Sequence, residues 1–215
     1  MTTAIIGVGQ IGSGLARDLV RGGERVVLAA RDQSHADALA SELGDRATAA
    51  PVREAIADAD VVVLAIWLDQ SRGLMPQIAD LLEGKVVVDP SNPIGFDKGQ
   101  VHRTLPEGTS AGSVVAGLLP TGAKLVKAFG SLGAASLAND ANRSPRRAVL
   151  FYATDDRAAA TIERLITTAG FDPVKVGGVK DAARIEVPGG DLHQNGGLNG
   201  RLLDVDQARA AVASA

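Results

Sequence analysis

The sequence contains no cysteine and few aromatic residues, and neither sign of charge dominates. Without cysteine, a disulfide framework, a zinc–thiolate site, an iron–sulfur cluster and a cysteine nucleophile are all excluded. Lysine and arginine number 22 against 25 acidic residues, so no basic excess favours nucleic acid as a partner. The longest apolar runs, such as residues 61–66, are too short to span a membrane. We therefore expect a globular protein that binds neither nucleic acid nor a membrane.

Glycine is the residue present in excess, at 25 of 215 positions, against a usual share of ~7%. The glycines show no three-residue period, which excludes collagen, and a hydrophobic fraction of 46% excludes disorder. The length predicts one domain, or one domain with a small appendage. A strand predicted from the start of the chain leaves no room for a signal peptide, so we expect a cytoplasmic protein.

Strands and helices alternate through the first part of the chain. Apolar runs predict strands, and helical spacing of apolar residues predicts helices between them. The predicted strands are 2–8, 25–30, 60–66 and 85–89, and the predicted helices are 10–21, 34–43, 51–59 and 70–82. Such alternation predicts an α/β fold, a Rossmann-type doubly wound parallel sheet.

The second half of the chain is less regular, and we expect a small C-terminal extension there. Residues 90–108 are rich in proline, glycine and asparagine and predict a long loop. Beyond it the sequence predicts helices at 110–119 and 155–168, strands at 124–129, 147–153 and 173–176, and a last helix from residue 204. We place the boundary between the two parts at residues 138 and 139.

The segment Gly7-Val-Gly-Gln-Ile-Gly12 matches the pattern G-x-G-x-x-G between a predicted strand and a predicted helix. In that context Gly7 makes the tight turn, Gly9 lets a pyrophosphate approach the backbone, and Gly12 packs the helix against the strand. The free N–H groups at the helix start then hold the phosphates. The alternative is a loop whose glycines serve only packing.

The end of the second predicted strand bears on the choice between NAD and NADP. An NAD site has an acidic residue there, and this sequence has Ala30 at that position, followed by Arg31. The planar guanidinium suits a 2′-phosphate, and Ser34 and His35 lie at the next helix start. We predict NADP, with Asp32 as a ribose-binding acid in the competing interpretation.

Four stretches taken together resemble one protein family. They are Gly7–Gly12, Ala30-Arg31, Val86–Pro93 and Val126–Ala134. In this order they resemble the coenzyme F420-dependent NADP oxidoreductase family, which transfers hydride between NADP and a deazaflavin. They are also similar to the cytosolic NADPH-binding domain of the membrane ferric reductases called STEAP. The resemblance covers nearly the whole chain.

The resemblance implies an NADP-binding Rossmann domain over residues 1–138, a small C-terminal α/β part over 139–215 that completes the substrate cleft, and a homodimer. It also implies site residues. Those along the phosphates, the 2′-phosphate and the middle of the cofactor are Gly9, Gln10, Ile11, Arg31, Ile66 and Trp67. Those bordering the nicotinamide are Asn92, Pro93, Ala128, Phe129 and Gly130. From the residues alone, Trp67 is equally well a half-buried packing residue.

The chain departs from the family at Gly130, where the deazaflavin enzymes carry a histidine and many bacterial relatives an asparagine. A polar contact to the second substrate is therefore missing. The resemblance supports NADP and leaves the identity of the acceptor open.

Hydride transfer between two stacked rings needs mainly proximity and orientation, because the cofactor carries the chemistry. The histidines His35, His102 and His193 form no catalytic triad or metal-ligand spacing, so we expect no metal. We predict an NADPH-dependent oxidoreductase that acts on a flavin, a deazaflavin or another small planar acceptor. An imine or carbonyl reductase would need a proton donor, and His193, on a glycine-rich segment that would close as a lid, is the candidate. A non-catalytic NADPH-binding protein is the third alternative.

Overall fold

The computed structural model describes residues 1–214, without the side chain of Asp156. Its centre is a sheet of strands β1 (Thr2–Ile6), β2 (Arg25–Ala29), β3 (Ala47–Ala49), β4 (Val61–Leu64), β5 (Val86–Asp89), β8 (Lys124–Lys127), β9 (Val149–Thr154) and β10 (Asp172–Gly177). Their order across the sheet is β10-β9-β8-β5-β4-β1-β2-β3. The strands are short and strongly apolar because both faces of the sheet are covered.

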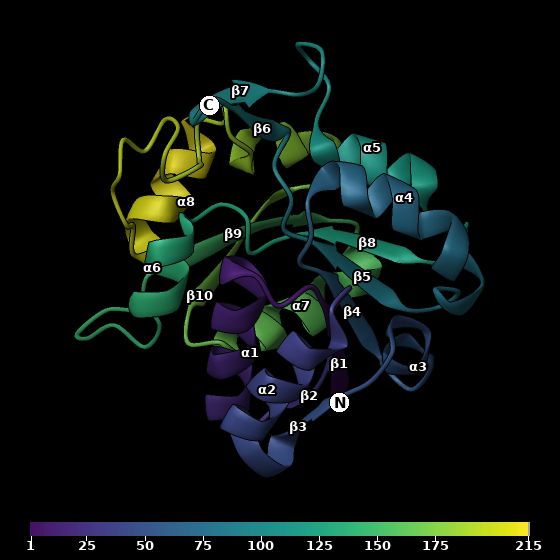
Figure 1. Ribbon diagram of the computed structural model, residues 1–215. Helices are drawn as coiled ribbons and strands as arrows, with labels where there is room; N and C mark the ends of the chain where they lie inside the picture. The colour runs from purple at the N-terminus through teal and green to yellow at the C-terminus, as the bar shows by residue number, and fades with distance from the viewer. Residues whose placement is uncertain (215) are drawn as a thin grey trace.

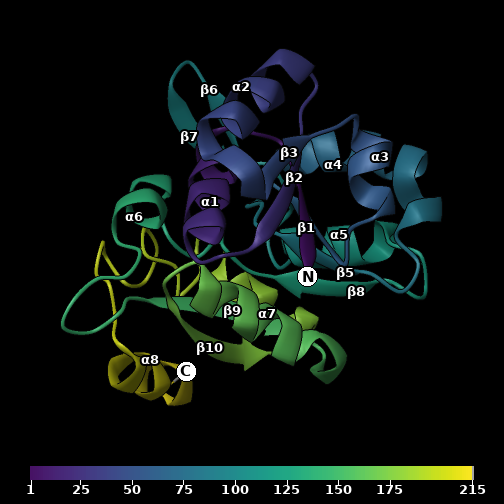
Figure 2. The same ribbon diagram turned by 90° about the horizontal axis from the view of Figure 1, so that it is seen from below.

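Helices cover the sheet in two layers (Figure 1). One face packs against α1 (Gln10–Arg21), α2 (Gln33–Leu43), α6 (Ala134–Asn139) and α7 (Asp156–Thr168). The other packs against α3 (Val52–Ala57), α4 (Leu68–Ile78) and α5 (Ala111–Leu118). The last helix, α8 (Val205–Ala213), packs against β10. Figure 2 shows α7 lying across β9 and β10, with α8 at the outer side of the same region.

The strand order confirms the predicted Rossmann-type fold. Six strands, β3-β2-β1-β4-β5-β8, are paired in parallel in the order of a dinucleotide-binding domain. Strand β9 then pairs antiparallel to β8, and β10 pairs parallel to β9. The C-terminal residues therefore extend the same sheet.

Two predicted segments differ in detail. Within the expected loop 90–108, strands β6 (Ile94–Asp97) and β7 (Gln100–Arg103) form an antiparallel hairpin outside the main sheet. The segment expected to form a lid after Gly177 instead begins with a 3-10 helix, Val179–Ile185. Backbone hydrogen bonds then fold residues 186–200 into consecutive tight turns, and Gln194 joins this segment to the connection after β8 through the Ser131 carbonyl and the Gly133 N–H. Within residues 1–214, no helix is long and apolar enough to cross a membrane.

Candidate active site

The carboxyl ends of β1, β2, β4, β5 and β8 lie along one edge of the sheet because these strands are parallel. In open α/β sheets, ligands bind outside this edge where the strand order reverses. Here the reversal lies between β1 and β4. Nearly all the residues predicted for the site lie on the connections that leave these five strands.

The glycine loop after β1 has the geometry of a phosphate site. Gly7 has φ +99°, and a Cβ added there would collide with the carbonyl oxygen of Ala65. A Cβ on Gly12 would collide with the Gly7 carbonyl, so this glycine allows α1 to pack onto the loop. Gly9, in contrast, faces open space, and α1 starts there without a side-chain cap or an acidic residue in its first turn. The start of α1 therefore leaves N–H groups and room for an anion.

Arg31 and Asp32 follow β2 and have different roles. The Asp32 carboxylate accepts hydrogen bonds from the Ser34 backbone N–H at 3.1 Å and from its hydroxyl at 2.7 Å, and so caps α2. The hydrogen bonds from the Ser34 hydroxyl and, second, from the Ser34 backbone N–H hold the pKa of Asp32 below its usual value. Arg31 is exposed and makes no ion pair with any of the side chains that the structure describes. At the position that distinguishes NADP from NAD, the Arg31 guanidinium is therefore available to a ligand, whereas the Asp32 carboxylate is occupied in capping α2.

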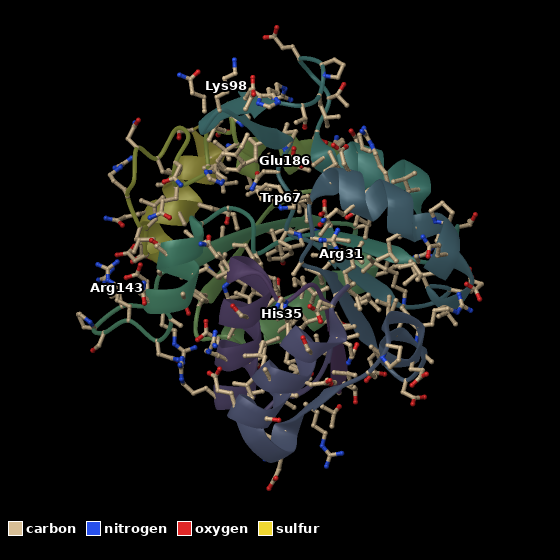
Figure 3. All side chains as sticks on the ribbon, in the orientation of Figure 1. Arg31, His35, Trp67, Lys98, Arg143 and Glu186 are labelled. Carbon is tan, nitrogen blue, oxygen red and sulfur yellow. The ribbon has the colours of Figure 1, made fainter. Side chains whose placement is uncertain are left out.

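The connection after β4 adjoins the glycine loop. Ile66 is half-buried, and its Cγ2 lies in the space that a Cβ on Gly7 would need. Trp67 is 51% exposed and precedes the first turn of α4. Figure 3 shows Trp67 between Arg31 and Glu186 in that view. The side chain thus lies outside the core, half exposed at the carboxyl edge.

The connections after β5 and β8 are clamped together by Asn92. Its side-chain nitrogen donates to the Gly130 carbonyl at 3.1 Å, and its oxygen accepts from the Val187 N–H at 2.8 Å. A Cβ on Gly130 would collide with the Pro90 carbonyl. Glycine at 130 thus permits the close approach of these two loops.

Three other residues predicted to border the nicotinamide have buried side chains. Pro93 is buried, and Ala128 and Phe129 are at most 1% exposed. Phe129 has φ +63°, a left-handed conformation that is uncommon for a non-glycine residue. The side chains of Ala128 and Phe129 belong to the hydrophobic core between the sheet and α1, so only their backbone can face a ligand at this edge.

A buried ionic network lies behind these connections. Lys127 Nζ is 2.9 Å from Asp89 Oδ2 and 3.5 Å from Glu186 Oε1, and it also donates to the Ser91 carbonyl. The three charged side chains are at most 2% exposed. Glu186 in turn accepts from the N–H groups of Ala111 and of its neighbour Gly112 at the start of α5, each at 2.8 Å. The network therefore joins β5, β8, α5 and the C-terminal segment.

His193 does not fit the expected role of proton donor. The side chain is 2% exposed, and Nδ1 accepts from the Asn195 N–H at 3.0 Å. Burial, opposed by a hydrogen bond to the Gly130 backbone and assisted by the Lys127 ammonium, lowers the pKa of His193 to about 4. The imidazole is therefore neutral at physiological pH and engaged with the protein. Leu192 and Leu198, on either side of His193, are buried in the structure. Two leucines in this glycine-rich stretch are the sequence signal that the segment is packed and is not a surface lid.

Sequence reasoning missed two serines at this edge. The hydroxyls of Ser91 and Ser131 follow β5 and β8, are buried, and have no hydrogen-bond partner in the structure. Native proteins rarely leave buried polar atoms unpaired, so each such hydroxyl needs an explanation. Both serines lie in the stretches that carry the family resemblance, 86–93 and 126–134, but neither is among the expected site residues.

Among the residues that the structure describes, no group of three or more His, Asp or Glu side chains could hold a metal ion. A surface hollow of about 880 Å³ lies between the start of β8 and the end of β9. It contains none of the predicted site residues, so the carboxyl edge remains the candidate.

Comparison with known proteins agrees with this geometry. The family model for NADP oxidoreductase, coenzyme F420-dependent, matches residues 2–93. The F420-dependent NADP reductase of Methanothermobacter thermautotrophicus is 29% identical over 199 residues, which cover 86% of this chain and 85% of the relative. Metalloreductase STEAP3 of Rattus norvegicus is 30% identical over 182 residues; the match covers 85% of this chain and 35% of STEAP3.

A solved structure extends the likeness over the whole fold. The crystal structure of a hypothetical protein, SMa0349, from Sinorhizobium meliloti is 31% identical to this chain, with a TM-score of 0.82. The match covers 95% of both chains. Together with the glycine loop and the exposed Arg31, these findings support an NADP-dependent oxidoreductase that is similar to the family described as coenzyme F420-dependent.

Proposed function

We propose that this protein is an NADPH-dependent reductase of a flavin- or deazaflavin-like acceptor. The observation that carries the proposal is the state of the ionisable groups behind the nicotinamide end of the carboxyl edge. Lys127, Asp89 and Glu186 are buried and paired with one another, and His193 is neutral. None of these side chains is free to protonate a substrate. An acceptor ring that needs no side-chain acid suits such a site better than an imine or a carbonyl does.

The cofactor fits the residues that are present. The open space at Gly9, with the uncapped start of α1, suits the pyrophosphate, with Gln10 and Ile11 alongside it. The exposed Arg31 suits the 2′-phosphate. When bound, NADPH supplies the hydride.

The unpaired serine hydroxyls suit the nicotinamide end of the cofactor. Ser91 and Ser131 would hydrogen-bond the nicotinamide carboxamide, which has both donor and acceptor atoms. Asn92 orders this end through its clamp between Gly130 and Val187, and does not act as a free ligand. The protein's own contribution is therefore to bind and orient two rings.

The experiment is an acceptor panel. NADPH oxidation is followed by absorbance with FMN, riboflavin, a deazaflavin, a cyclic imine and an aldehyde as acceptors. We expect oxidation with the flavin or deazaflavin and none above background with the imine or aldehyde. Tight NADPH binding without oxidation by any planar acceptor would contradict the proposal and favour a non-catalytic binding protein.

The homodimer and the cytoplasmic location stay predictions of the family resemblance and the sequence. Analytical ultracentrifugation with and without NADPH measures the first. A tagged full-length chain, followed by fractionation, measures the second.

A further inference from the structure

Two aromatic side chains are exposed and contact each other at the carboxyl edge. Trp67 is 51% exposed and Phe96 is 58% exposed, with ring centroids 5.7 Å apart and an edge-to-face angle of 82°. The chain has six Phe, Tyr and Trp residues in all. The other four, Phe129, Tyr152, Phe151 and Phe171, are at most 2% exposed. Two rings left in solvent by a chain so poor in aromatics indicate a surface that something else covers.

The pair stands where the acceptor must approach. Trp67 lies on the connection that leaves β4, and Phe96 lies on β6, in the connection that leaves β5. These are two neighbouring parallel strands, and the β4 connection also packs against the glycine loop. In a sheet of this order the bound dinucleotide crosses from β1 toward β4 and β5. The two rings therefore flank the half of the edge on which hydride leaves the cofactor.

Phe96 is held there by an anchored hairpin. Strands β6 and β7 pair in register, with Ile94 opposite Arg103 and Phe96 opposite Val101. The Arg103 guanidinium donates to three carbonyl oxygens, those of Leu105 at 3.0 Å, Thr109 at 2.7 Å and Pro188 at 2.9 Å. These bonds tie the hairpin base to the start of α5 and to the C-terminal segment. Figure 3 shows Lys98, at the hairpin tip, above Trp67 and Glu186 in that view.

We propose that Phe96, together with Trp67, forms the face against which the planar ring of the acceptor packs, so that hairpin β6–β7 selects a flavin-type acceptor. This inference rests on the proposed function and deepens it. Aromatic rings prefer offset-stacked or edge-to-face neighbours, and the pair offers both arrangements to a third, larger ring. Val101, 57% exposed opposite Phe96, widens the apolar face.

The test uses Trp67 as the reporter, because it is the only tryptophan in the chain. Trp67 fluorescence is titrated with FMN and with riboflavin, in the presence of saturating NADP⁺, for the unmodified protein, Phe96→Ala and Phe96→Tyr. Asp97→Ala is the matched control, since adjacent residues of a strand point to opposite faces. NADPH binding is measured on each variant by energy transfer from Trp67. Sedimentation reports the oligomeric state.

We expect Phe96→Ala to raise the Kd for both flavins roughly tenfold and to leave NADPH binding unchanged, with Phe96→Tyr and Asp97→Ala close to the unmodified protein. Flavin turnover and flavin Kd that are both unchanged in Phe96→Ala would overturn this inference and leave the proposed function standing. A change in oligomeric state with unchanged flavin Kd would assign the rings to contact between two copies and also overturn it. Absence of flavin binding to the unmodified protein would overturn this inference, and the proposed function would then depend on the deazaflavin arm of the acceptor panel.

Discussion

The ammonium of Lys127 lies 2.9 Å from the carboxylate of Asp89, and both side chains are almost completely excluded from solvent. The two residues end adjacent parallel strands, β8 and β5, in register with each other. Taking charges out of water is costly, and this pair persists because Glu186, the Ser91 carbonyl and the start of α5 complete its hydrogen bonds. The relationship fixes the two connections that border the proposed nicotinamide site.

Removing the cation should therefore destabilise the whole fold. Lys127→Met leaves the buried carboxylates of Asp89 and Glu186 without a counter-charge, and we expect a loss of ~3–5 kcal/mol in the free energy of unfolding. Urea denaturation followed by circular dichroism measures it. Arg53→Ala, which removes an exposed ion pair with Asp80 and an exposed hydrogen bond to the Gln77 carbonyl, is the control and should cost much less. Equal losses in the two variants would contradict a structural role for the buried network.

Two glycines of the same loop should give opposite phenotypes when changed to alanine. Gly9→Ala should keep the stability of the unmodified protein, because no described atom lies near the new Cβ. It should lose about tenfold or more in NADPH affinity, because the methyl group keeps the charged pyrophosphate from hydrogen-bonding the backbone N–H groups. Gly12→Ala should lose about 1–3 kcal/mol of stability, because its Cβ collides with the Gly7 carbonyl. Thermal unfolding and equilibrium titration with NADPH separate the two effects. Unchanged NADPH affinity in Gly9→Ala would remove the phosphates from this loop.

Arg31 should set the preference for NADPH over NADH. Arg31→Ala removes a guanidinium that is free in the structure, and a lost charge-assisted contact costs about 10–100-fold in NADPH affinity. NADH affinity should hardly change, because NADH has no 2′-phosphate. Arg143→Ala, an arginine on the exposed loop after α6 (Figure 3), controls for net charge. An equal loss of affinity for both nucleotides would favour the competing assignment in which the ribose is bound by Asp32.

Replacing the buried Asp18 should stabilise the protein in a pH-dependent way. Its side chain is 2% exposed, and burial raises its pKa to about 6, against the opposing effect of Arg21. The folded protein thus binds this proton more tightly than the unfolded chain does. The buried charge of ionised Asp18 therefore lowers the free energy of unfolding fully above pH 6, and this loss of stability disappears as the pH falls to about 3.8. Asp18→Asn should stabilise the protein by on the order of 2–3 kcal/mol at pH 8 and have little effect near pH 4.

Chemical denaturation at a series of pH values measures this difference. The exposed carboxylate variant Asp206→Asn gives the size of change that loss of a surface charge causes. A stabilisation by Asp18→Asn that is the same at pH 8 and pH 4 would contradict the account.

Local patterns predicted the Rossmann sheet, the glycine loop and Arg31 because each depends on residues close together in the sequence. Apolar runs such as 61–66 identify buried strands, and the glycine spacing identifies the turn into α1. The hairpin β6–β7 escaped prediction because its residues show no clean alternation, and its large apolar side chains, Phe96 and Val101, face solvent.

The buried network escaped prediction because its members meet only in the folded chain. Glu186 contacts the start of α5 across 75 residues of sequence, and Lys127 contacts Asp89 across 38. The burial of His193 escaped prediction because glycines surround it in the sequence. In the structure those glycines permit close backbone turns, and one of them, Gly196, leaves no space for a Cβ beside the Gly190 carbonyl.

The most direct test of hydride transfer to a planar acceptor is a single-turnover experiment with NADPH deuterated at the nicotinamide C4. The protein is mixed with this NADPH and excess FMN or deazaflavin, and both absorbance decay and label position are followed from pH 5.5 to 8.5. We expect the NADPH absorbance to decay only when an acceptor is present, and to decay more slowly with the deuterated cofactor. The rate should be nearly independent of pH, because no side-chain acid takes part. For the deazaflavin, the label should appear on the reduced ring. A rate that depends on one protonated group, or no acceptor-dependent decay while NADPH is bound, would contradict this account.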